Sequence, residues 1–352
     1  MSTDARIIGT ATTVPPYTKS TEEILAYLDT FLEGQEKRFR DKIKRIFKYA
    51  QVDRRYAIMP AEEVFQPMSF SEKNQRYVKA TKVMAREVLQ KALDDAQIDG
   101  KELDYIITVS CTGFMIPSVD AYLINEMGLT QDIVRLPVTE MGCVGGISGM
   151  IYAQKFLESN PGAKAAVVAV ESPSATFQRT DFSMTNMVSA AIFGDGAAAV
   201  ILSSDDGPGP VIQDSGMYHF YNETEMMGFE VVDRGFQMVL DVEVPEKIAE
   251  KFDDILIPFL RENQMDVSDV DHLIFHPGGK KIINQVEALF KEKGKNIEHT
   301  KAVLRNYGNM SSATVLFVLD AFRKEGVQAG DTGLMLSFGP GFTAQRILLK
   351  WR

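Results

Sequence analysis

Stretches in which hydrophobic residues recur with the period of a helix alternate along the chain with short apolar stretches typical of strands. The stretch 83–96 keeps Val88, Leu89 and Leu93 on one face, which predicts an amphipathic helix. The apolar run 164–172 is short and rich in valine, and it predicts a buried strand. Helices that alternate with such strands are typical of a largely parallel sheet covered by helices. The pattern therefore predicts an α/β fold.

One order of elements occurs twice, at a constant shift of 167 positions. The segment QIDGKELDYII (97–107) resembles QMDVSDVDHLI (264–274). With the same shift and no gap, the predicted helix matches 250–263, and the strand 164–172 matches 331–339. Chance similarity between two α/β stretches is the alternative, but the gap-free extent of the match argues against it. We interpret the pattern as two duplicated halves of one layered structure, with ligands bound where the halves meet.

Composition fits a globular protein with a large core. The 352 residues are 45% hydrophobic and 24% charged, and no apolar run reaches the roughly 18 to 20 residues of a membrane span. The first residues lack the layout of a signal peptide, so we expect a cytoplasmic protein. The two cysteines, Cys111 and Cys143, are too few for a disulfide framework and are expected to be free thiols.

The charge balance narrows the class of ligand. A formal net charge of −10 disfavours a nucleic-acid binder, because a phosphate backbone needs a basic face. Any anionic ligand therefore needs a local basic patch. The run RFRDKIKRIFKYAQVDRRY (38–56) could supply one, and it includes Lys42, Arg45, Lys48 and Arg55. A solvated helix face is the common explanation of such a run and remains the alternative.

Cys143 is the first candidate for chemistry. It stands in TEMGCVGG (139–146), between an extended stretch and an apolar helical pattern, and so at a predicted helix N-terminus. Unpaired amides and the positive end of the helix dipole favour a thiolate there, and the small neighbours leave room for a substrate. A small buried core residue is the alternative. The sequence context leaves both open.

Two more polar residues are candidates for the same site. His276 ends the apolar run DHLIFH, so its imidazole is expected at the carboxyl end of a strand, although a structural histidine is the alternative. The shift of 167 places Cys143 over Met310, which is next to Asn309. A helix cap needs only the oxygen of Asn309, whereas its amide N–H groups can donate to a developing oxyanion. The same three residue types also form hydrolytic triads, and the sequence does not separate these geometries.

Five motifs together resemble the type III polyketide synthases, the chalcone synthase-like family with the thiolase fold. They are TEMGCVGG, AAIFGDGAAAVIL, LIFHPGGKKIINQVE, NYGNMSSATVLFVLDAF and SFGPGF, and the resemblance covers nearly the whole chain. It implies an α-β-α-β-α layered architecture. In that reading, residues 1–210 form the half with the nucleophilic cysteine, and residues 211–352 form the half with the catalytic histidine and asparagine.

The resemblance also implies an activity and a set of site residues. The activity is iterative decarboxylative Claisen condensation of malonyl-CoA onto an acyl starter on Cys143, followed by cyclisation to a phenol, resorcinol or pyrone. His276 and Asn309 complete the catalytic triad, and Phe193 is the aromatic gatekeeper of the cavity, whereas its residue context alone suggests a core phenylalanine. The other expected substrate-binding residues are Cys111, Phe229, Met238, Ser311 and Gly339.

Three details of that set carry their own expectations. Cys111 is either a cavity residue or a buried strand cysteine, and the bulk of Phe229 suggests a small product. Ser337 stands where the family usually has glycine, so we expect a local change of the cavity wall. Ile116 matches a loop residue that reaches the partner's cavity in the homodimers that the family forms.

The resemblance assigns substrates rather than cofactors. Lys42 and Arg45 match positions that hold coenzyme A phosphates, and Lys48 lies one residue from a third such position. Lys280 and Lys281 could add charge to the same entrance. The expected partners are an acyl-CoA starter, malonyl-CoA and a second copy of the chain. No metal or redox cofactor is expected, because decarboxylation itself supplies the carbon nucleophile.

Three other functions stay open at this stage. A ketoacyl synthase that starts fatty-acid synthesis has the same fold and residue types, but it usually carries an HQ-type motif where this chain has HPGG. A noncatalytic thiolase-fold scaffold would not need Cys143, His276 and Asn309 at the positions of the family's catalytic triad. A cysteine hydrolase would release a free acid and form no carbon bond.

Overall fold

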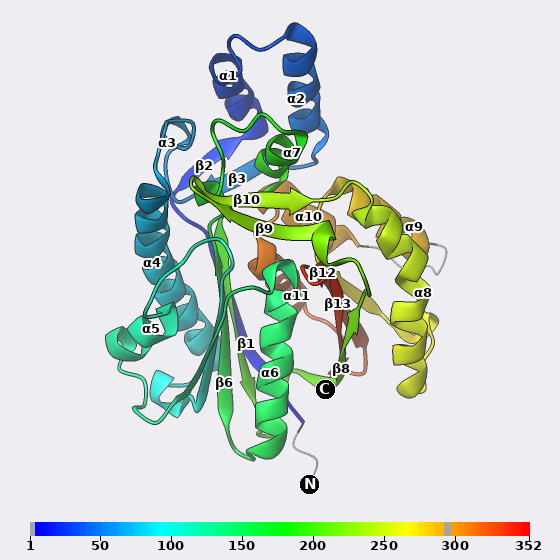
Figure 1. The fold of residues 1–352 in the computed structure, drawn as a ribbon. Coiled ribbons are helices and arrows are strands. Elements are labelled where there is room, and N and C mark those ends of the chain that lie inside the picture. The colour runs from blue at the N-terminus through cyan, green and yellow to red at the C-terminus, as the bar shows by residue number, and fades with distance from the viewer. Residues whose placement is uncertain (1–3, 292–296) are drawn as a thin grey trace.

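The computed structural model describes residues 4–291 and 297–352, and their helices and strands stack in five layers (Figure 1). From left to right in Figure 1 the order is outer helices, sheet, central helices, sheet and outer helices. The helices of these layers are α4 (Phe70–Ala96) and α5 (Val119–Met127), then α6 (Gly145–Ser159) and α11 (Thr314–Glu325), then α8 (Val244–Glu262) and α9 (Lys280–Lys291). The layered α-β-α-β-α architecture expected from the sequence is confirmed.

The strands repeat one topology in the two halves. The main sheet has the order β11-β12-β13-β8-β1-β7-β6-β4-β5. Its strands are β1 (Arg6–Thr13), β4 (Tyr105–Val109), β5 (Val134–Val138), β6 (Lys164–Glu171), β7 (Gly196–Ser203), β8 (Pro210–His219), β11 (His272–Phe275), β12 (Thr332–Gly339) and β13 (Thr343–Trp351). In one half β4 is parallel to β6, and β7 and β1 follow antiparallel. In the other half β11 is parallel to β12, and β13 and β8 follow antiparallel.

The two halves also keep the register of the sequence repeat. β4 begins at Tyr105 and β11 begins at His272, which are the positions that the shift of 167 pairs. A short 3-10 turn precedes each central helix, η2 (Gly142–Val144) before α6 and η6 (Ser311–Ala313) before α11. The half-sheets join where Arg6 of β1 pairs with Val211 of β8, so the main sheet is continuous. The duplication predicted from the sequence is therefore present in the structure.

The central helices α6 and α11 are buried between the two half-sheets and contact each other. Their residues are mostly apolar, as a helix covered on all sides requires. Gly146 permits their close approach, because a Cβ at this position would lie 2.3 Å from the Ser312 carbonyl oxygen. The outer helix α8 packs its phenylalanines and isoleucines on β11 and β12, and α4 covers β1, β6 and β7. The core thus consists of apolar layers on both faces of each half-sheet.

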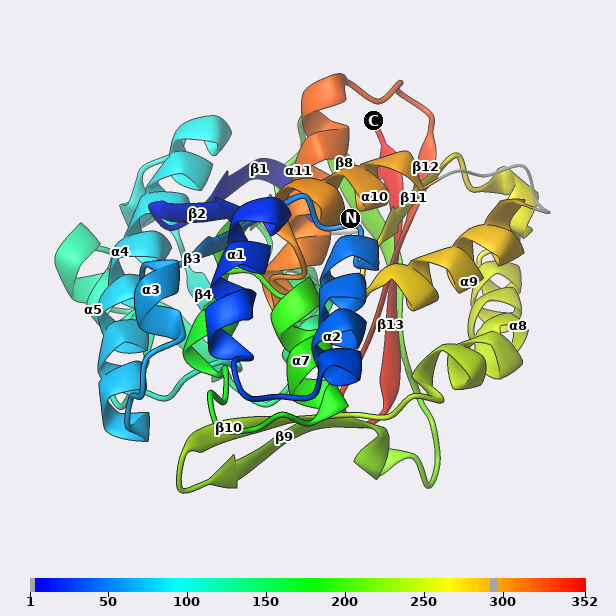
Figure 2. The same ribbon diagram turned by 90° about the horizontal axis from the view of Figure 1, so that it is seen from above.

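Smaller elements gather at one end of the layers, at the top of Figure 1 and toward the viewer in Figure 2. They are β2 (Tyr17–Ser20), α1 (Thr21–Phe31), α2 (Lys37–Tyr49), β3 (Arg54–Ala57), α3 (Ala61–Val64), α7 (Met184–Ile192), β9 (Met227–Val232), β10 (Gly235–Leu240) and α10 (Glu298–Tyr307). The strands β2 and β3 form one hairpin, and β9 and β10 form another outside the main sheet. Among the described residues, no helix combines the length and the apolar character that crossing a membrane requires.

Candidate active site

A cavity of about 690 Å³ is lined by residues of both halves and of the β9–β10 hairpin. Cys143, His276 and Asn309 all line it, although they are distant from one another in the sequence. The hairpin supplies much of the remaining wall, including Phe229 and Met238. The structure therefore brings together the three residues that the sequence singled out for chemistry.

Cys143 lies in the η2 turn directly before α6. The turn is fixed from β12, because the Ser337 hydroxyl donates to the Cys143 carbonyl at 2.8 Å. Gly142 has a φ of +51°, a left-handed conformation that favours glycine, and Pro340 leaves no room for a Cβ there. The Cys143 Sγ contacts the Ser311 hydroxyl at 3.7 Å. The thiol is thus held at the N-terminal end of a buried helix, as the sequence predicted.

His276 follows the last residue of β11 and is only 2% exposed. Its backbone N–H donates to the Leu336 carbonyl at 2.9 Å, which extends the pairing between β11 and β12 by one residue. Within the described part of the chain, neither ring nitrogen has a hydrogen-bond partner. A buried imidazole without partners is expensive unless a ligand uses it. Both nitrogens are therefore available to a substrate or to the Cys143 proton.

Asn309 is held so that its carboxamide has one orientation. Its Oδ1 accepts hydrogen bonds from the Ser311 backbone N–H at 2.8 Å and from the Thr314 hydroxyl at 3.3 Å. Its Nδ2 donates to the Gly278 carbonyl at 3.3 Å, in the turn that follows His276. The oxygen is thus occupied within the protein, and the second hydrogen of Nδ2 is directed to the Cys143 side of the cavity. Such a fixed donor in a buried site suits a developing oxyanion.

Burial dominates the electrostatics of the thiol and the imidazole. It raises the pKa of Cys143 to about 12, with a further increase from Glu171, while the hydrogen bonds of Ser311 and Asn309 lower it. Burial also lowers the pKa of His276 to about 3. Each charge by itself is therefore disfavoured in the cavity. A proton that moves from the thiol to the imidazole creates both charges together, and their attraction then offsets part of this cost.

Cys111 lines the same cavity. Its Sγ lies 3.4 Å from the Ser311 hydroxyl and 3.5 Å from Glu171 Oε1. Burial and the Glu171 carboxylate raise the pKa of the Cys111 thiol well above its usual value. Cys111 is therefore a neutral polar contact beside Cys143. Ser311 lies between the two sulfur atoms and contacts both.

Phe193, Phe229 and Met238 form the bulky part of the wall. Phe229 and Met238 face each other across the β9–β10 hairpin, and the Phe229 ring centroid lies 5.8 Å from that of Phe236. Phe193 directly follows α7 and pairs with Asn309 in an isolated β-bridge. Phe193, the predicted gatekeeper, and Asn309 are therefore neighbours through their backbones, which the sequence did not indicate.

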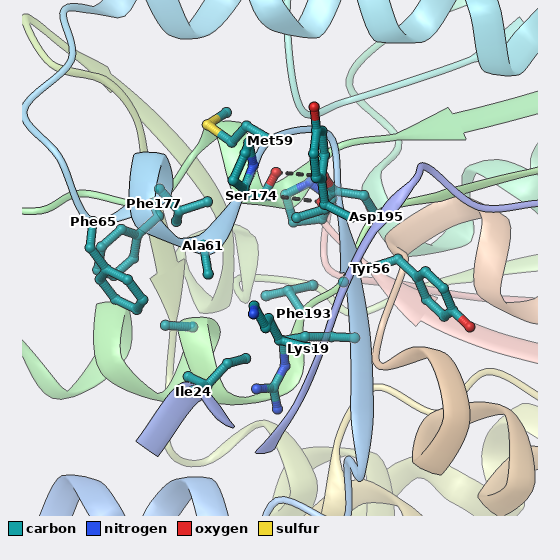
Figure 3. A pocket seen from close by; sticks show the side chains of 18 of the residues that line it. Lys19, Ile24, Tyr56, Met59, Ala61, Phe65, Ser174, Phe177, Phe193 and Asp195 are labelled. Carbon is teal, nitrogen blue, oxygen red and sulfur yellow. Dashed lines mark hydrogen bonds between the residues drawn. The ribbon is translucent and has the colours of Figure 1, made fainter. Parts of the chain in front are cut away.

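A second cavity of about 360 Å³ adjoins the first at Phe193, Met238 and Pro173 (Figure 3). Phe65 and Phe177 lie together on one side of this smaller cavity. Since Phe193 and Met238 line both spaces, their side chains separate two compartments. No motif in the sequence pointed to the smaller compartment, because its wall combines residues from several distant segments.

Two residues of the SFGPGF loop lie behind the cavity wall and not in it. Gly339 does not line the cavity, because it packs against the cysteine turn, where a Cβ would lie 2.9 Å from the Val144 nitrogen. Ser337 does not alter the cavity wall, because its buried hydroxyl is directed to the Cys143 carbonyl. Phe338 and Pro340 line the cavity instead. Side chains alternate in direction along β12, and this alternation decides which residues reach the cavity.

The basic helix α2 carries some cationic side chains that are exposed and unpaired and others that form ion pairs. Lys42, Arg45 and Lys48 are exposed and occur at every third position, which places them along one side of the helix. None of these three forms an ion pair or hydrogen bond with a described residue. Lys37 and Lys44 are instead paired with Asp41 and Asp29. The first three cations are therefore available to an anionic ligand.

The end of α2 lies next to the entry of α9 (Figure 2). The Lys280 Nζ lies 5.5 Å from the centre of the exposed Tyr49 ring. Gly278 and Ile282, on either side of Lys280 in the chain, line the cavity. The basic side of α2 and the His276 turn thus belong to the same region of the surface.

Ile116 is 81% exposed, and it belongs to the loop that carries the cavity residue Phe114. Phe114 is itself 54% exposed, and Val134 in the edge strand β5 is 48% exposed. The homodimer and the contact of Ile116 with a partner remain predictions.

The chain matches two family models that together span almost its whole length. Residues 2–206 match the N-terminal domain of chalcone and stilbene synthases, and residues 215–351 match their C-terminal domain. The 1,3,6,8-tetrahydroxynaphthalene synthase of Streptomyces coelicolor is 34% identical over 309 residues, which cover 88% of this chain and 82% of that protein. The phloroglucinol synthase of Pseudomonas fluorescens is 29% identical over 313 residues, 88% of each chain.

Solved structures agree with the sequence relatives. The crystal structure of the Streptomyces coelicolor tetrahydroxynaphthalene synthase, a bacterial type III polyketide synthase, superposes with a TM-score of 0.93 and 31% identity over 99% of both chains. The structure of PKS-I from the brown alga Ectocarpus siliculosus gives 0.91 and 26% identity over 99% of this chain and 98% of that one. Similarity over both halves favours this family over a ketoacyl synthase, a scaffold or a hydrolase.

Replacement of His276 by alanine should make the Cys143 thiol unreactive near neutral pH. Without a proton acceptor, burial alone governs the thiol and keeps its pKa high, so alkylation by iodoacetamide at pH 7 should slow on the order of 100-fold. A raised pKa also means that the remaining rate should still increase from pH 7 to pH 9. Mass spectrometry of the labelled cysteine measures this, with His272→Ala outside the cavity as control. Equal rates in parent and variant would contradict the role of His276.

Proposed function

The chain belongs to the chalcone and stilbene synthase family and is a type III polyketide synthase, and we propose that Cys143, His276 and Asn309 divide its chemistry. Cys143 carries the acyl chain, Asn309 stabilises the enolate formed by decarboxylation, and His276 serves both steps. The observation that supports this most is the meeting of a thiol, a partner-free imidazole and an oriented carboxamide in one buried cavity.

Acyl loading is the first step. The Cys143 Sγ attacks the thioester carbon of an acyl-CoA while its proton moves to His276. The carbon–sulfur bond to coenzyme A then breaks, and the proton on His276 passes to the departing coenzyme A thiolate. Because proton transfer and attack occur together, no isolated charge is left in the cavity. The loaded enzyme holds a neutral thioester and a neutral imidazole.

Decarboxylation then makes the carbon nucleophile. Malonyl-CoA loses carbon dioxide, and the electron pair of the broken carbon–carbon bond forms an enolate with its charge on the thioester oxygen. Asn309 Nδ2 and an N–H of His276 donate to that oxygen. The enolate carbon attacks the acyl carbon on Cys143, and the Cys143 sulfur leaves as a thiolate that carries the negative charge of the enolate. The product is a coenzyme A thioester longer by two carbons, which returns to Cys143 for the next cycle.

The cavity supports a small product. Its volume of about 690 Å³ is limited by Phe193, Phe229 and Met238. Repeated extension fills this space until the poly-β-keto chain folds and cyclises to a phenol, resorcinol or pyrone. Relatives named for tetrahydroxynaphthalene and phloroglucinol are consistent with a polyhydroxylated aromatic product. The reaction needs no metal or redox cofactor, since decarboxylation provides the driving force.

Coenzyme A thioesters approach through the region between α2 and the His276 turn. Lys42, Arg45 and Lys48 are exposed and unpaired among the described residues, and they suit the phosphates of coenzyme A. Coenzyme A substrates and two free cysteines are consistent with a cytoplasmic enzyme. A second copy of the chain would cover the exposed Ile116 and bring it to the partner's cavity.

Single substitutions should separate the three roles. Cys143→Ala should still convert malonyl-CoA to acetyl-CoA but form no polyketide. Asn309→Ala should keep acyl loading and lose on the order of 10²- to 10³-fold in decarboxylation, the usual effect of one oxyanion donor. His276→Ala should impair both steps. Radiolabelled acyl-CoA reports loading, and acetyl-CoA release reports decarboxylation. The division of roles is wrong if folded Cys143→Ala cannot decarboxylate, or if Asn309→Ala decarboxylates at the parent rate.

Charge reversal on α2 should weaken substrate binding. Lys42→Glu combined with Arg45→Glu should raise the KM for malonyl-CoA, reduce its dependence on salt and leave kcat nearly unchanged. The matched control is Lys37→Glu combined with Lys44→Glu, the same change in charge at the two paired lysines of the same helix. Steady-state kinetics at several salt concentrations measures both. Equal KM values for the two double variants would show that Lys42 and Arg45 do not contribute to the binding of malonyl-CoA.

Light scattering should find about twice the 39.2 kDa of one chain, as expected for a homodimer. Ile116→Asp should shift the equilibrium toward monomer, because an exposed apolar side chain at an interface is replaced by a charge. Val242→Asp provides the control, since Val242 is also exposed, at 77%, but lies two residues before α8. A fully active monomer at micromolar concentration would refute the homodimer.

A further inference from the structure

Arg55 is a buried arginine that the mechanism above does not use. It lies in β3 and is 8% exposed. Its Nη2 donates to the Ala191 carbonyl at 2.9 Å and to the Thr21 hydroxyl at 3.3 Å. Ala191 belongs to the last turn of α7, whose carbonyls lack partners within the helix. A cation at this end also stabilises the negative pole of the helix dipole. Arg55 thus fixes the end of α7, directly before Phe193.

The segment after Phe193 is held by the same strand. The Asp195 backbone N–H donates to the Tyr56 carbonyl at 2.9 Å, and the Ile58 N–H donates to Asp195 Oδ2 at 2.8 Å. Asp195 Oδ1 accepts from the Ser174 N–H at 2.8 Å, and Figure 3 shows Ser174 and Asp195 side by side. The β3 strand and the residue that follows it therefore hold the chain on both sides of the gatekeeper.

The segment 192–194 in turn holds Asn309. The Asn309 N–H donates to the Ile192 carbonyl at 2.8 Å, and the Gly194 N–H donates to the Asn309 carbonyl at 3.0 Å. The two backbones are in close contact, because a Cβ on Gly194 would lie 2.3 Å from the Tyr307 carbonyl oxygen. A displacement of the end of α7 therefore displaces Asn309 as well.

We propose that Arg55 is a positioning residue for the reaction: by holding the Ala191 carbonyl, it fixes the Phe193–Asn309 bridge and thereby the carboxamide that faces the cavity. The inference rests on the proposed function, in which Asn309 donates to the enolate oxygen. A misplacement of about 1 Å in such a donor can cost on the order of 100-fold in rate. The strand that follows the basic helix α2 thus acts on catalysis from outside the catalytic cavity.

A charged group at this position is costly, which argues against a role in packing alone. The Nε and Nη1 atoms of Arg55 have no hydrogen-bond partner among the described residues. Burial lowers the pKa of Arg55 to about 10, so the side chain stays charged at neutral pH. The Phe47 ring, 5.5 Å from Cζ, offsets part of the cost. An apolar side chain would fill the space without this penalty, but it could not donate to Ala191.

Two substitutions and a matched control test the proposal. Arg55→Met removes the donor, and Arg55→Lys keeps a charge and one donor. The control Arg346→Met changes another buried arginine, which donates to the Ile255 carbonyl and lies over Phe259. The measurements are carbon dioxide release from malonyl-CoA, acyl loading on Cys143, the KM for malonyl-CoA and the thermal midpoint.

Arg55→Met should lower kcat for decarboxylation by about 10- to 100-fold, with KM within about twofold and acyl loading retained. Arg55→Lys should recover part of this loss, and it carries the test if the methionine variant does not fold. Arg346→Met should lower the thermal midpoint without lowering kcat in the folded protein. The proposal is overturned if Arg55→Met decarboxylates at the parent rate, or if loading and decarboxylation decline together in proportion to the folded fraction.

The double variant with Asn309→Ala shows through which residue Arg55 acts. If the effect passes through Asn309, adding Arg55→Met to Asn309→Ala should cause less than about a twofold further loss. A full additional loss would overturn the proposal, while the role of Asn309 itself would stand. If Asn309→Ala alone decarboxylates at the parent rate, the proposed function of Asn309 fails, and positioning through Asn309 fails with it.

Discussion

The contact between the central helices α6 and α11 is the constraint on which the site depends. Gly146 allows the two helices to approach so closely that a Cβ would collide with the Ser312 carbonyl. The approach brings together the turns that precede the helices. Cys143 lies in the η2 turn, and Asn309 lies two residues before the η6 turn. His276 follows from the same arrangement, because β11 pairs with β12, and β12 also supports the cysteine turn through Ser337. The site is thus a product of the duplicated fold.

The same burial that assembles the site also controls its chemistry. His276 and Asn309 are each 2% exposed and Cys143 is half-buried, so an unbalanced charge there is unfavourable and a fixed hydrogen-bond donor is effective. The protein satisfies the oxygen of Asn309 internally but leaves both His276 nitrogens without a described partner. The surroundings therefore disfavour a charge on Cys143 or His276 alone, and they favour charge formation when the substrate and the proton acceptor are both in place.

Much of this was predictable from the sequence because it is periodic or stands in a motif. The repeat predicted the two halves and their register, and the motifs indicated the three central residues. Side-chain direction was less accessible. Gly339 was expected in the cavity but packs behind it, and Ser337 points to the cysteine turn. Arg55 was grouped with a basic surface run, yet alternation along the short strand β3 exposes Arg54 and buries Arg55. Contacts between distant segments decide these cases, and a local pattern does not contain them.

The β9–β10 hairpin has an evolutionary consequence. It provides Phe229 and Met238 to the cavity wall, but its strands pair only with each other and lie outside the main sheet. Substitutions in this wall therefore leave the hydrogen bonds of the nine-stranded sheet intact. During evolution, the shape of the cavity can therefore change through substitutions in the hairpin, while Cys143, His276 and Asn309 stay unchanged. New products can then arise from neutral substitutions in the β9–β10 hairpin, with little effect on the stability of the fold.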